Sequence, residues 1–180
     1  GISQALLSHY EKGIRECGLD FLVRALGRLK ERTSRPFCCA VAGDGPLMDA
    51  IRSQISAAGL TEEIRLLGYR RDVPEILASS QLYLCSSSCN EALSFAILEA
   101  MNAALPLVVT DVGGNRDLAE TDGVCGTVVP YGDADAFAGA IQAYMDDPEL
   151  RARLSAAATE KVARRFDLNK LALDVYHTYF

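Results

Sequence analysis

The chain has 180 residues and a formal net charge of −6 at pH 7, with an isoelectric point near 4.9. Its apolar fraction of 49% is enough to build a hydrophobic core, which excludes a disordered or fibrous chain. The acidic balance argues against a broad surface for nucleic acid or anionic lipid, so an anionic ligand must be held by a few local N–H groups and cations.

Predicted helices and strands alternate along the chain. Leucines at helical spacing predict an amphipathic helix over residues 18–32, and the apolar run at 37–42 predicts a buried strand. The elements that follow are a helix from Pro46 to Gly59, a strand at 64–67, a helix at 73–78, a strand at 82–84 and a helix at 95–104. After them come a strand at 107–110, a short helix at 117–120, a strand at 127–129 and helices from 133 onward.

This alternation predicts an α/β fold: a doubly wound, Rossmann-like parallel sheet of five or so strands with helices on both faces. We expect a single domain over residues 1–180, with the C-terminal helices at about 133–180. The chain begins without Met, so we expect a fragment whose first strand and whose second Rossmann unit lie outside it.

Two glutamates, Glu91 and Glu99, are separated by seven residues in the pattern E-x(7)-E. The segment from Phe95 to Ala104 is apolar almost all round, which predicts a buried helix. A charge in such a helix is costly unless it is paired, so Glu99 is a candidate functional residue. The predicted strand, small polar loop and helix describe the place where open α/β sheets bind ligands.

Neither a disulfide framework nor a metal site is predicted. The six cysteines include no C-x-x-C pair, and the two histidines, His9 and His177, lie near opposite ends of the chain. We expect reduced thiols, a cytoplasmic protein and no cofactor. No stretch of about twenty apolar residues or signal peptide is visible, so no direct membrane segment is expected.

Five motifs follow one another in a characteristic order. They are G-D-G-P-L at 43–47, L-G-Y-R-R-D-V-P at 67–74, E-x(7)-E-A-M at 91–101, T-D-V-G-G at 110–114 and V-P-Y-G-D at 129–133. Together they resemble the C-terminal, donor-binding lobe of retaining GT-B glycosyltransferases, and most of all glycosyltransferase family 4. The resemblance runs from about Glu11 to Phe166.

The resemblance implies an enzyme that transfers a sugar from a nucleotide diphosphate sugar to an acceptor hydroxyl with retention of configuration and without a metal. A separate N-terminal lobe, absent from this chain, would bind an acceptor sugar or lipid. It would also carry any contact with a membrane, so the parent protein is expected in the cytoplasm or peripheral to a membrane. No nucleic-acid partner is implied.

The resemblance also assigns roles to the E-x(7)-E region. Glu91 would lie beside the donor sugar as a catalytic residue, and Glu99 would accept hydrogen bonds from the ribose. The alternatives are a capping or surface carboxylate for Glu91 and a glutamate paired with an arginine for Glu99. Backbone N–H groups at Leu93, Ser94 and Phe95 would hold the diphosphate, and Ser94 is also expected to cap the helix.

Here the chain departs from the family. Ala92 stands where the family usually has glycine, and Ser94 stands where it often has glycine or proline. These two differences leave the exact pose of the donor undetermined, but they do not change where the site is expected.

Lys12 resembles the family's lysine that meets the donor diphosphate, which makes it the second catalytic candidate. The family usually adds an arginine upstream, and here Gln4 is the nearest polar residue to that place. Residues 14–17 also look like an insertion before the helix. A solvated loop lysine is the alternative for Lys12.

Three further loops complete the predicted donor site. Gly43 and Asp44 follow the second predicted strand and face the same crevice. The next two loops contribute Tyr69 and Arg70 at the nucleobase, and Gly114 and Asn115 near the donor sugar. The alternatives are glycines that only make turns and an aromatic ring at the rim of the site.

Three functions compete for this pattern. The chain is predicted to belong to a glycosyltransferase, or else to be a nucleotide-sugar-binding module that is inactive without its N-terminal lobe. A GT-B epimerase or phosphorylase is disfavoured, because E-x(7)-E is a transferase feature and no lysine context for pyridoxal phosphate is present.

Overall fold

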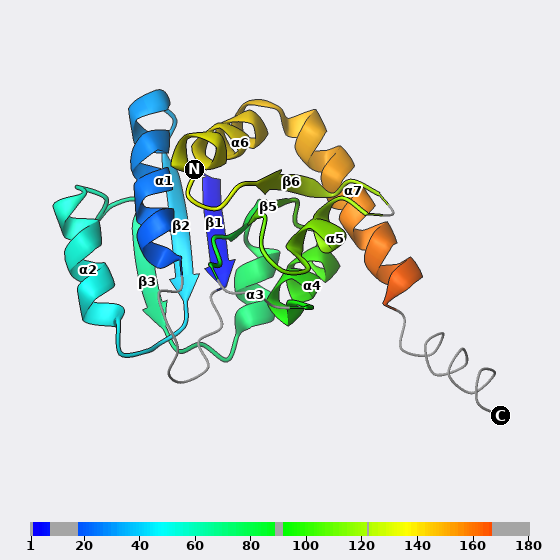
Figure 1. Ribbon diagram of the computed structural model, residues 1–180, viewed down its shortest axis with the longest axis horizontal. Helices are drawn as coiled ribbons and strands as arrows, with labels where there is room; N and C mark the ends of the chain where they lie inside the picture. Colours follow the sequence, from blue (N-terminus) through cyan, green and yellow to red (C-terminus); the bar gives the residue numbers. More distant parts are fainter. Residues whose placement is uncertain (1, 8–17, 89–91, 122, 167–180) are drawn as a thin grey trace.

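The computed structural model describes residues 2–7, 18–88, 92–121 and 123–166. Its strands form one six-stranded sheet in the order β3-β2-β1-β4-β5-β6, and all neighbouring strands are parallel (Figure 1). The strands are β1 (Ile2–Leu7), β2 (Phe37–Ala42), β3 (Ile64–Gly68), β4 (Tyr83–Cys85), β5 (Leu107–Thr110) and β6 (Gly126–Val129). The chain winds outward from β1 to β3 on one side and from β4 to β6 on the other, which confirms the doubly wound α/β fold.

The helices lie on both faces of this sheet (Figure 1). They are α1 (Leu19–Arg32), α2 (Met48–Ala57), α3 (Val73–Ala78), α4 (Phe95–Asn102), α5 (Asn115–Ala119), α6 (Ala134–Asp146) and α7 (Pro148–Arg165). Buried side chains of α1, α2 and α6 form one hydrophobic cluster, and those of α3, α4, α5 and the second half of α7 form the other. None of the described helices is both long and apolar enough to span a lipid bilayer.

Adjacent residues of the central strands belong alternately to the two hydrophobic clusters. Leu84 and Val108 belong to the cluster under α1 and α6, whereas Tyr83 and Val109 belong to the cluster under α4 and α5. Adjacent side chains of a strand point to opposite faces, so a strand covered on both faces is apolar at every position. This is why β5 is buried throughout and its first three residues are all apolar.

The expectation that the first strand lies outside the chain is wrong. Residues Ile2–Leu7 form β1, which pairs with β2 along its whole length and with β4 through Ala5 and Tyr83. Ser3 and Gln4 interrupt the apolar pattern by which the other strands were recognised. The strand forms all the same, because a central strand is stabilised by pairing with its two neighbours more than by the intrinsic β propensity of its residues.

Several helix ends differ from the predicted ones by about two residues. Helix α4 ends at Asn102 instead of Ala104, because Ala104 takes the left-handed conformation, with φ at 58°. The Leu105 N–H then donates to the carbonyl of Ala100 at 3.0 Å, which closes the helix end. Helix α2 begins at Met48 instead of Pro46, and α5 begins at Asn115, two residues early.

The last two helices begin at aspartates that cap them. The Asp133 carboxylate accepts from the Ala136 N–H at 2.9 Å, and the Asp147 carboxylate accepts from the Leu150 N–H at 2.8 Å. Pro148 is the first residue of α7, where its missing N–H costs nothing. The predicted C-terminal helices are confirmed as far as Arg165.

Candidate functional site

The strand order reverses between β1 and β4, which lie next to each other in the sheet. The chain leaves β1 toward α1 on one face and leaves β4 toward α4 on the other. In open α/β sheets this arrangement creates a crevice at the carboxyl ends of the two strands, and ligands bind there. The predicted site residues of the described chain lie in loops or helix starts that follow the carboxyl ends of strands, except Glu99, which lies in the second half of α4.

Helix α4 begins at this crevice with unbonded backbone donors. Its first intrahelical bond runs from the Leu98 N–H to the Ser94 carbonyl at 3.2 Å, so the N–H groups of Phe95, Ala96 and Ile97 have no partner within the helix. Ser94 occupies the N-cap position, as predicted, but its side chain makes no capping bond. An unbonded helix start of this kind is suited to an anion.

The prediction that α4 is buried all round is wrong. Ile97, Ala100 and Met101 form its buried side, whereas Phe95 is 76% exposed and Glu99 is exposed as well. Phe95 and Glu99 are four residues apart and therefore share one face of the helix. The Glu99 carboxylate makes no ion pair with any described residue, so the arginine partner considered as an alternative is not among the described residues.

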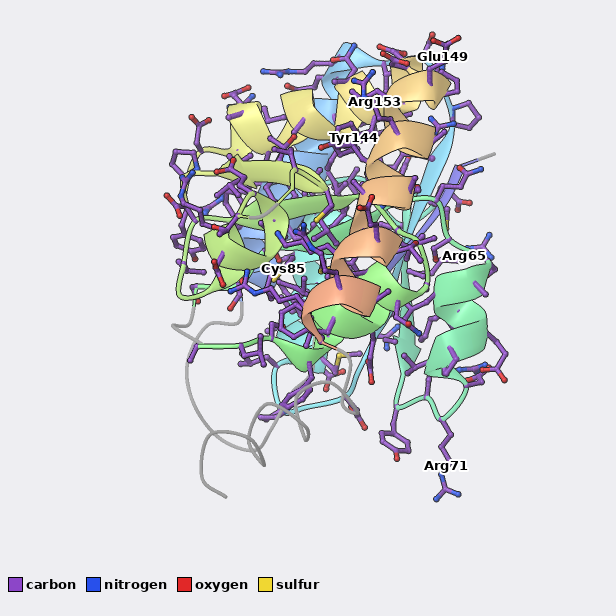
Figure 2. All side chains as sticks on the ribbon, turned by 90° about the vertical axis from the view of Figure 1, so that its right-hand side faces the viewer. Arg65, Arg71, Cys85, Tyr144, Glu149 and Arg153 are labelled. Carbon is purple, nitrogen blue, oxygen red and sulfur yellow. The ribbon has the colours of Figure 1, made fainter. Side chains whose placement is uncertain are left out.

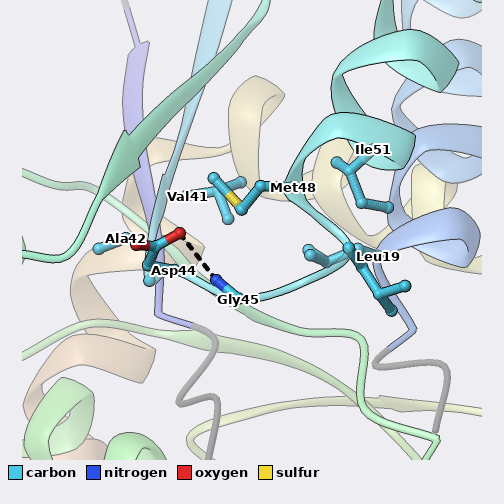
Figure 3. A pocket seen from close by; sticks show the side chains of 9 residues that line it. Leu19, Val41, Ala42, Asp44, Gly45, Met48 and Ile51 are labelled. Atoms are coloured by element: carbon cyan, nitrogen blue, oxygen red, sulfur yellow. Dashed lines mark hydrogen bonds between the residues drawn. The ribbon is translucent and has the colours of Figure 1, made fainter. Parts of the chain in front are cut away.

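A pocket lies at the carboxyl end of β2, between α1 and α2 (Figure 3). The Asp44 carboxylate accepts a hydrogen bond from the Gly45 N–H at 2.8 Å and so shapes the turn. The Gly43 N–H donates to the Gly68 carbonyl at 2.9 Å and links this turn to the end of β3. The pocket is lined by apolar side chains and the turn itself: Leu19, Val41, Ala42, Gly43, Asp44, Gly45, Leu47, Met48 and Ile51.

The loop after β3 presents an aromatic ring and two arginines. Tyr69 is 72% exposed. The Arg70 guanidinium binds the Asp72 carboxylate through two nitrogens, with Nε 2.8 Å from Oδ1, and this hydrogen bonding lowers the pKa of Asp72. Arg71 has no ion pair among the described residues and extends away from the body of the molecule (Figure 2). The charge of Arg70 is therefore already offset by Asp72, and its contact with the nucleobase stays a prediction.

The turn after β5 carries the other predicted contacts. Gly114 is the N-cap of α5, and Asn115 is the first residue of that helix. Asn115 is only 3% exposed, and its side-chain nitrogen donates to the Thr110 carbonyl at 3.0 Å. Nearby, Arg116 bonds Asp111 and Glu120, and its hydrogen bond lowers the pKa of Asp111. Asn115 as a contact of the donor stays a prediction, whereas its bond to β5 is observed.

Two catalytic candidates, Glu91 and Lys12, lie outside the described residues. Only their places between described residues can be given. Lys12 falls between β1 and Gly18, and Glu91 falls between Ser88 and Ala92. Lys12 follows β1 in the sequence and Glu91 follows β4, the two strands between which the strand order reverses.

Three structural residues near the site escaped the sequence analysis. Gly18 begins α1 with φ at 69°, and an added Cβ would lie 1.7 Å from the Ser86 carbonyl oxygen. Thr110 is fully buried at the end of β5. Lys161 is 2% exposed, and its Nζ donates to the carbonyls of Asp117 at 3.0 Å and Leu118 at 2.7 Å, at the end of α5. A glycine as the first residue of a predicted helix was the only local signal among the three.

The described part of the chain holds neither a candidate metal site nor a disulfide. No group of three or more His, Cys, Asp or Glu side chains is placed there to hold a metal ion. The described cysteines, Cys38, Cys39, Cys85 and Cys125, are free thiols. Burial raises the pKa of Cys39 and of Cys125, which keeps both thiols protonated.

The model of the family Glycosyl transferases group 1 matches residues 5–161. The chain belongs to this family. The match confirms the resemblance drawn from the five sequence motifs. It also begins within β1, consistent with that strand being part of the domain.

Curated members of the family give the same result. The chain is 33% identical over 156 residues to the alpha-D-kanosaminyltransferase of Streptomyces kanamyceticus, covering 86% of this chain and 40% of that protein. It is 35% identical over 169 residues to the phosphatidyl-myo-inositol mannosyltransferase of Mycobacterium leprae (strain TN), covering 93% of this chain and 40% of that protein. The chain thus spans about 40% of the length of these relatives.

Solved structures show the same fold. Anabaena Alr3699/HepE, in complex with UDP and glucose, superimposes with a TM-score of 0.85 at 24% identity, covering 98% of this chain and 47% of that chain. WaaG, a glycosyltransferase involved in lipopolysaccharide biosynthesis, superimposes with a TM-score of 0.79 at 22% identity, covering 97% and 46%. The fold is that of one Rossmann-like half of the GT-B glycosyltransferases.

Proposed function

We propose that this chain binds a nucleotide diphosphate sugar at the crevice between β1 and β4 and is the donor-binding lobe of a glycosyltransferase. One observation carries the proposal: α4 begins with unbonded N–H groups at the point where the strand order reverses, and Glu99 is exposed on the same helix. The Anabaena protein of the same fold, solved in complex with UDP-glucose, supports this ligand class.

Each part of the donor would meet a different part of the crevice. The N–H groups of Phe95 and Ala96 would bind the diphosphate, with those of Leu93 and Ser94 close by. Glu99 lies about one turn further along α4, at a distance that suits the ribose hydroxyls next to the phosphates. The base would lie toward the loop of Tyr69 and Arg70.

The transfer would retain the configuration of the sugar. The bond from the anomeric carbon to the diphosphate breaks, and the acceptor oxygen bonds to that carbon on the same face. A diphosphate oxygen near the anomeric carbon takes the acceptor's proton. Lys12 and the start of α4 would offset the charge on the leaving diphosphate in place of a metal, and Glu91 would orient the sugar.

Transfer would require a second lobe for the acceptor, a sugar or a lipid. The supporting fact is that the chain spans about 40% of the relatives it matches. The chain by itself would therefore act as a nucleotide-sugar-binding module. Turnover of a sugar nucleotide with candidate acceptors by the 180-residue chain alone would contradict this part of the proposal. A cytoplasmic place for the parent protein, peripheral to a membrane, stays a prediction.

Glu99→Ala tests the role of the exposed glutamate. Two hydrogen bonds from ribose to a carboxylate would be lost, so we expect binding of UDP or GDP to weaken about tenfold or more. Isothermal titration calorimetry measures this loss. Glu149→Ala, a change at the start of α7 far from the crevice (Figure 2), is the control and should leave the affinity unchanged. Equal affinities for Glu99→Ala and the wild-type chain would refute this role.

The base and sugar of the donor can be ranked by thermal shift. Sugar nucleotides of uridine, guanosine and adenosine would be compared at equal concentrations. A ligand present at a hundred times its dissociation constant adds about 2.7 kcal/mol to the free energy of unfolding. The true donor should therefore give the largest rise in Tm.

A further inference from the structure

The first part of the loop between β4 and α4, residues 86–88, is held from the β5 side by a buried hydroxyl. The Thr110 Oγ1 donates to the Ser87 carbonyl at 2.7 Å and lies 3.3 Å from the Cys85 carbonyl oxygen. Thr110 is fully buried. The two carbonyl oxygens that meet this hydroxyl are therefore turned toward the interior of the protein.

Asn115 extends this contact into α5. Its side-chain nitrogen donates to the Thr110 carbonyl at 3.0 Å and lies 3.8 Å from the Cys85 sulfur. The amide nitrogen has two hydrogens, and each points toward one of these two contacts. The end of β5, the start of α5 and the end of β4 are thus tied together by two buried side chains.

The same loop is confined on its other side by the start of α1. Ser86 is buried, and its carbonyl oxygen lies where a side chain at position 18 would begin, 1.7 Å from an ideal Cβ. Only glycine leaves room for this approach. Residues 86–88 are therefore held between the α1 start and the β5–α5 turn.

This arrangement matters because of what the crevice is proposed to bind. A carbonyl oxygen is the negative end of a backbone dipole, and it repels a diphosphate when it faces the ligand. The Thr110 hydroxyl donates to one such oxygen, that of Ser87, and lies close to a second, that of Cys85, at the end of the strand that leads toward α4. In the proposed site this hydroxyl would remove negative potential beside the diphosphate and hold residues 86–88 in place.

We infer that Thr110 and Asn115 are positioning residues of the donor site: Thr110 holds the carbonyl oxygens of Cys85 and Ser87 away from the crevice so that it accepts an anionic diphosphate, and Asn115 holds the end of β5 that carries Thr110. The inference rests on the proposed function. It assigns neither residue a contact with the ligand. It also predicts that substituting these residues weakens the binding of a charged diphosphate more than that of an uncharged nucleoside. A general loss of stability would weaken both equally.

Thr110→Val and Thr110→Ser test this inference as a matched pair. Valine keeps the shape of threonine and removes the hydroxyl, whereas serine keeps the hydroxyl. UDP, GDP and ADP, and the nucleosides uridine, guanosine and adenosine, are titrated into each variant and followed by NMR. For the nucleotide that binds the wild-type chain, Thr110→Val should weaken binding of the diphosphate about tenfold and of its nucleoside less than twofold. Thr110→Ser should stay within twofold of the wild-type chain for both ligands.

Two results would overturn the role in binding. One is an unchanged diphosphate affinity in Thr110→Val. The other is an equal loss for diphosphate and nucleoside, which would reveal a purely structural residue. If Thr110→Val does not fold, Thr110→Ala takes its place and is judged by the same criteria.

A second measurement needs no ligand and separates this inference from the proposed function. Amide hydrogen exchange at residues 86–88 should be at least tenfold faster in Thr110→Val than in the wild-type chain, with β2 unchanged. Equal exchange rates would overturn the positioning itself. If the wild-type chain binds none of the nucleotides, the proposed function and the ligand part of the inference both fail, and the exchange rates alone decide whether Thr110 holds the loop.

Discussion

The two sides of the crevice use their side chains differently. On the β4–β5 side, Thr110 and Asn115 are buried and bonded to neighbouring elements. On the β2–β3 side, Tyr69 is exposed, and Asp44 and Arg70 make the hydrogen bonds described above within their own loops. Binding and stability should therefore be coupled on the β4–β5 side and separable on the β2–β3 side. Substitutions on the two sides can test that contrast.

The largest effect is expected at Gly18, where α1 meets the β4–α4 loop. Gly18→Ala places a Cβ against the Ser86 carbonyl and forces alanine to a φ near 69°. We expect a loss of about 2–4 kcal/mol in the free energy of unfolding, measured by urea denaturation, from the clash and the left-handed backbone together.

Gly27→Ala is the matched control, because it makes the same change in the same helix. Nothing lies within 4 Å of an added Cβ there, so alanine should stabilise the helix by about 0.5–1 kcal/mol. Losses of similar size at both positions would show that the contact between Gly18 and Ser86 has no special importance.

A smaller loss is expected at Lys161, which supports α5 from α7. Lys161→Met leaves the carbonyls of Asp117 and Leu118 without this donor, so we expect a loss of about 1–3 kcal/mol. Arg153→Met, on the exposed side of the same helix (Figure 2), should change the stability by less than about 0.5 kcal/mol. If Lys161→Met costs no more than the control, the buried ammonium group is not a support of α5.

The smallest effect on stability is expected on the β2–β3 side. Tyr69→Ala removes an exposed ring from the loop after β3, so the free energy of unfolding should change by less than about 0.5 kcal/mol. If the base lies beside this loop, affinity for the nucleotide should fall severalfold in calorimetry. A large loss of stability would show that the two sides do not differ as described.

The sequence predicted the elements with strong periodicity and missed those defined by distant contacts. Helix α3 has the predicted ends, since Pro74 and the short apolar pattern mark it locally. The surface position of Glu99 was missed, because a helix that is apolar all round does not reveal which of its faces the rest of the protein covers. Thr110 was missed because its partner, Ser87, is 23 residues away in the sequence.

The central claim is that a nucleotide sugar binds at the carboxyl edge of the sheet, at the start of α4. Backbone amide NMR during a titration with UDP-sugars and GDP-sugars tests this most directly. The amide signals of Phe95 and Ala96 should shift on binding, while those of Gly123 and Val124, before β6 at the opposite edge, should stay in place. Shifts confined to that opposite edge, or none with any sugar nucleotide, would contradict this claim.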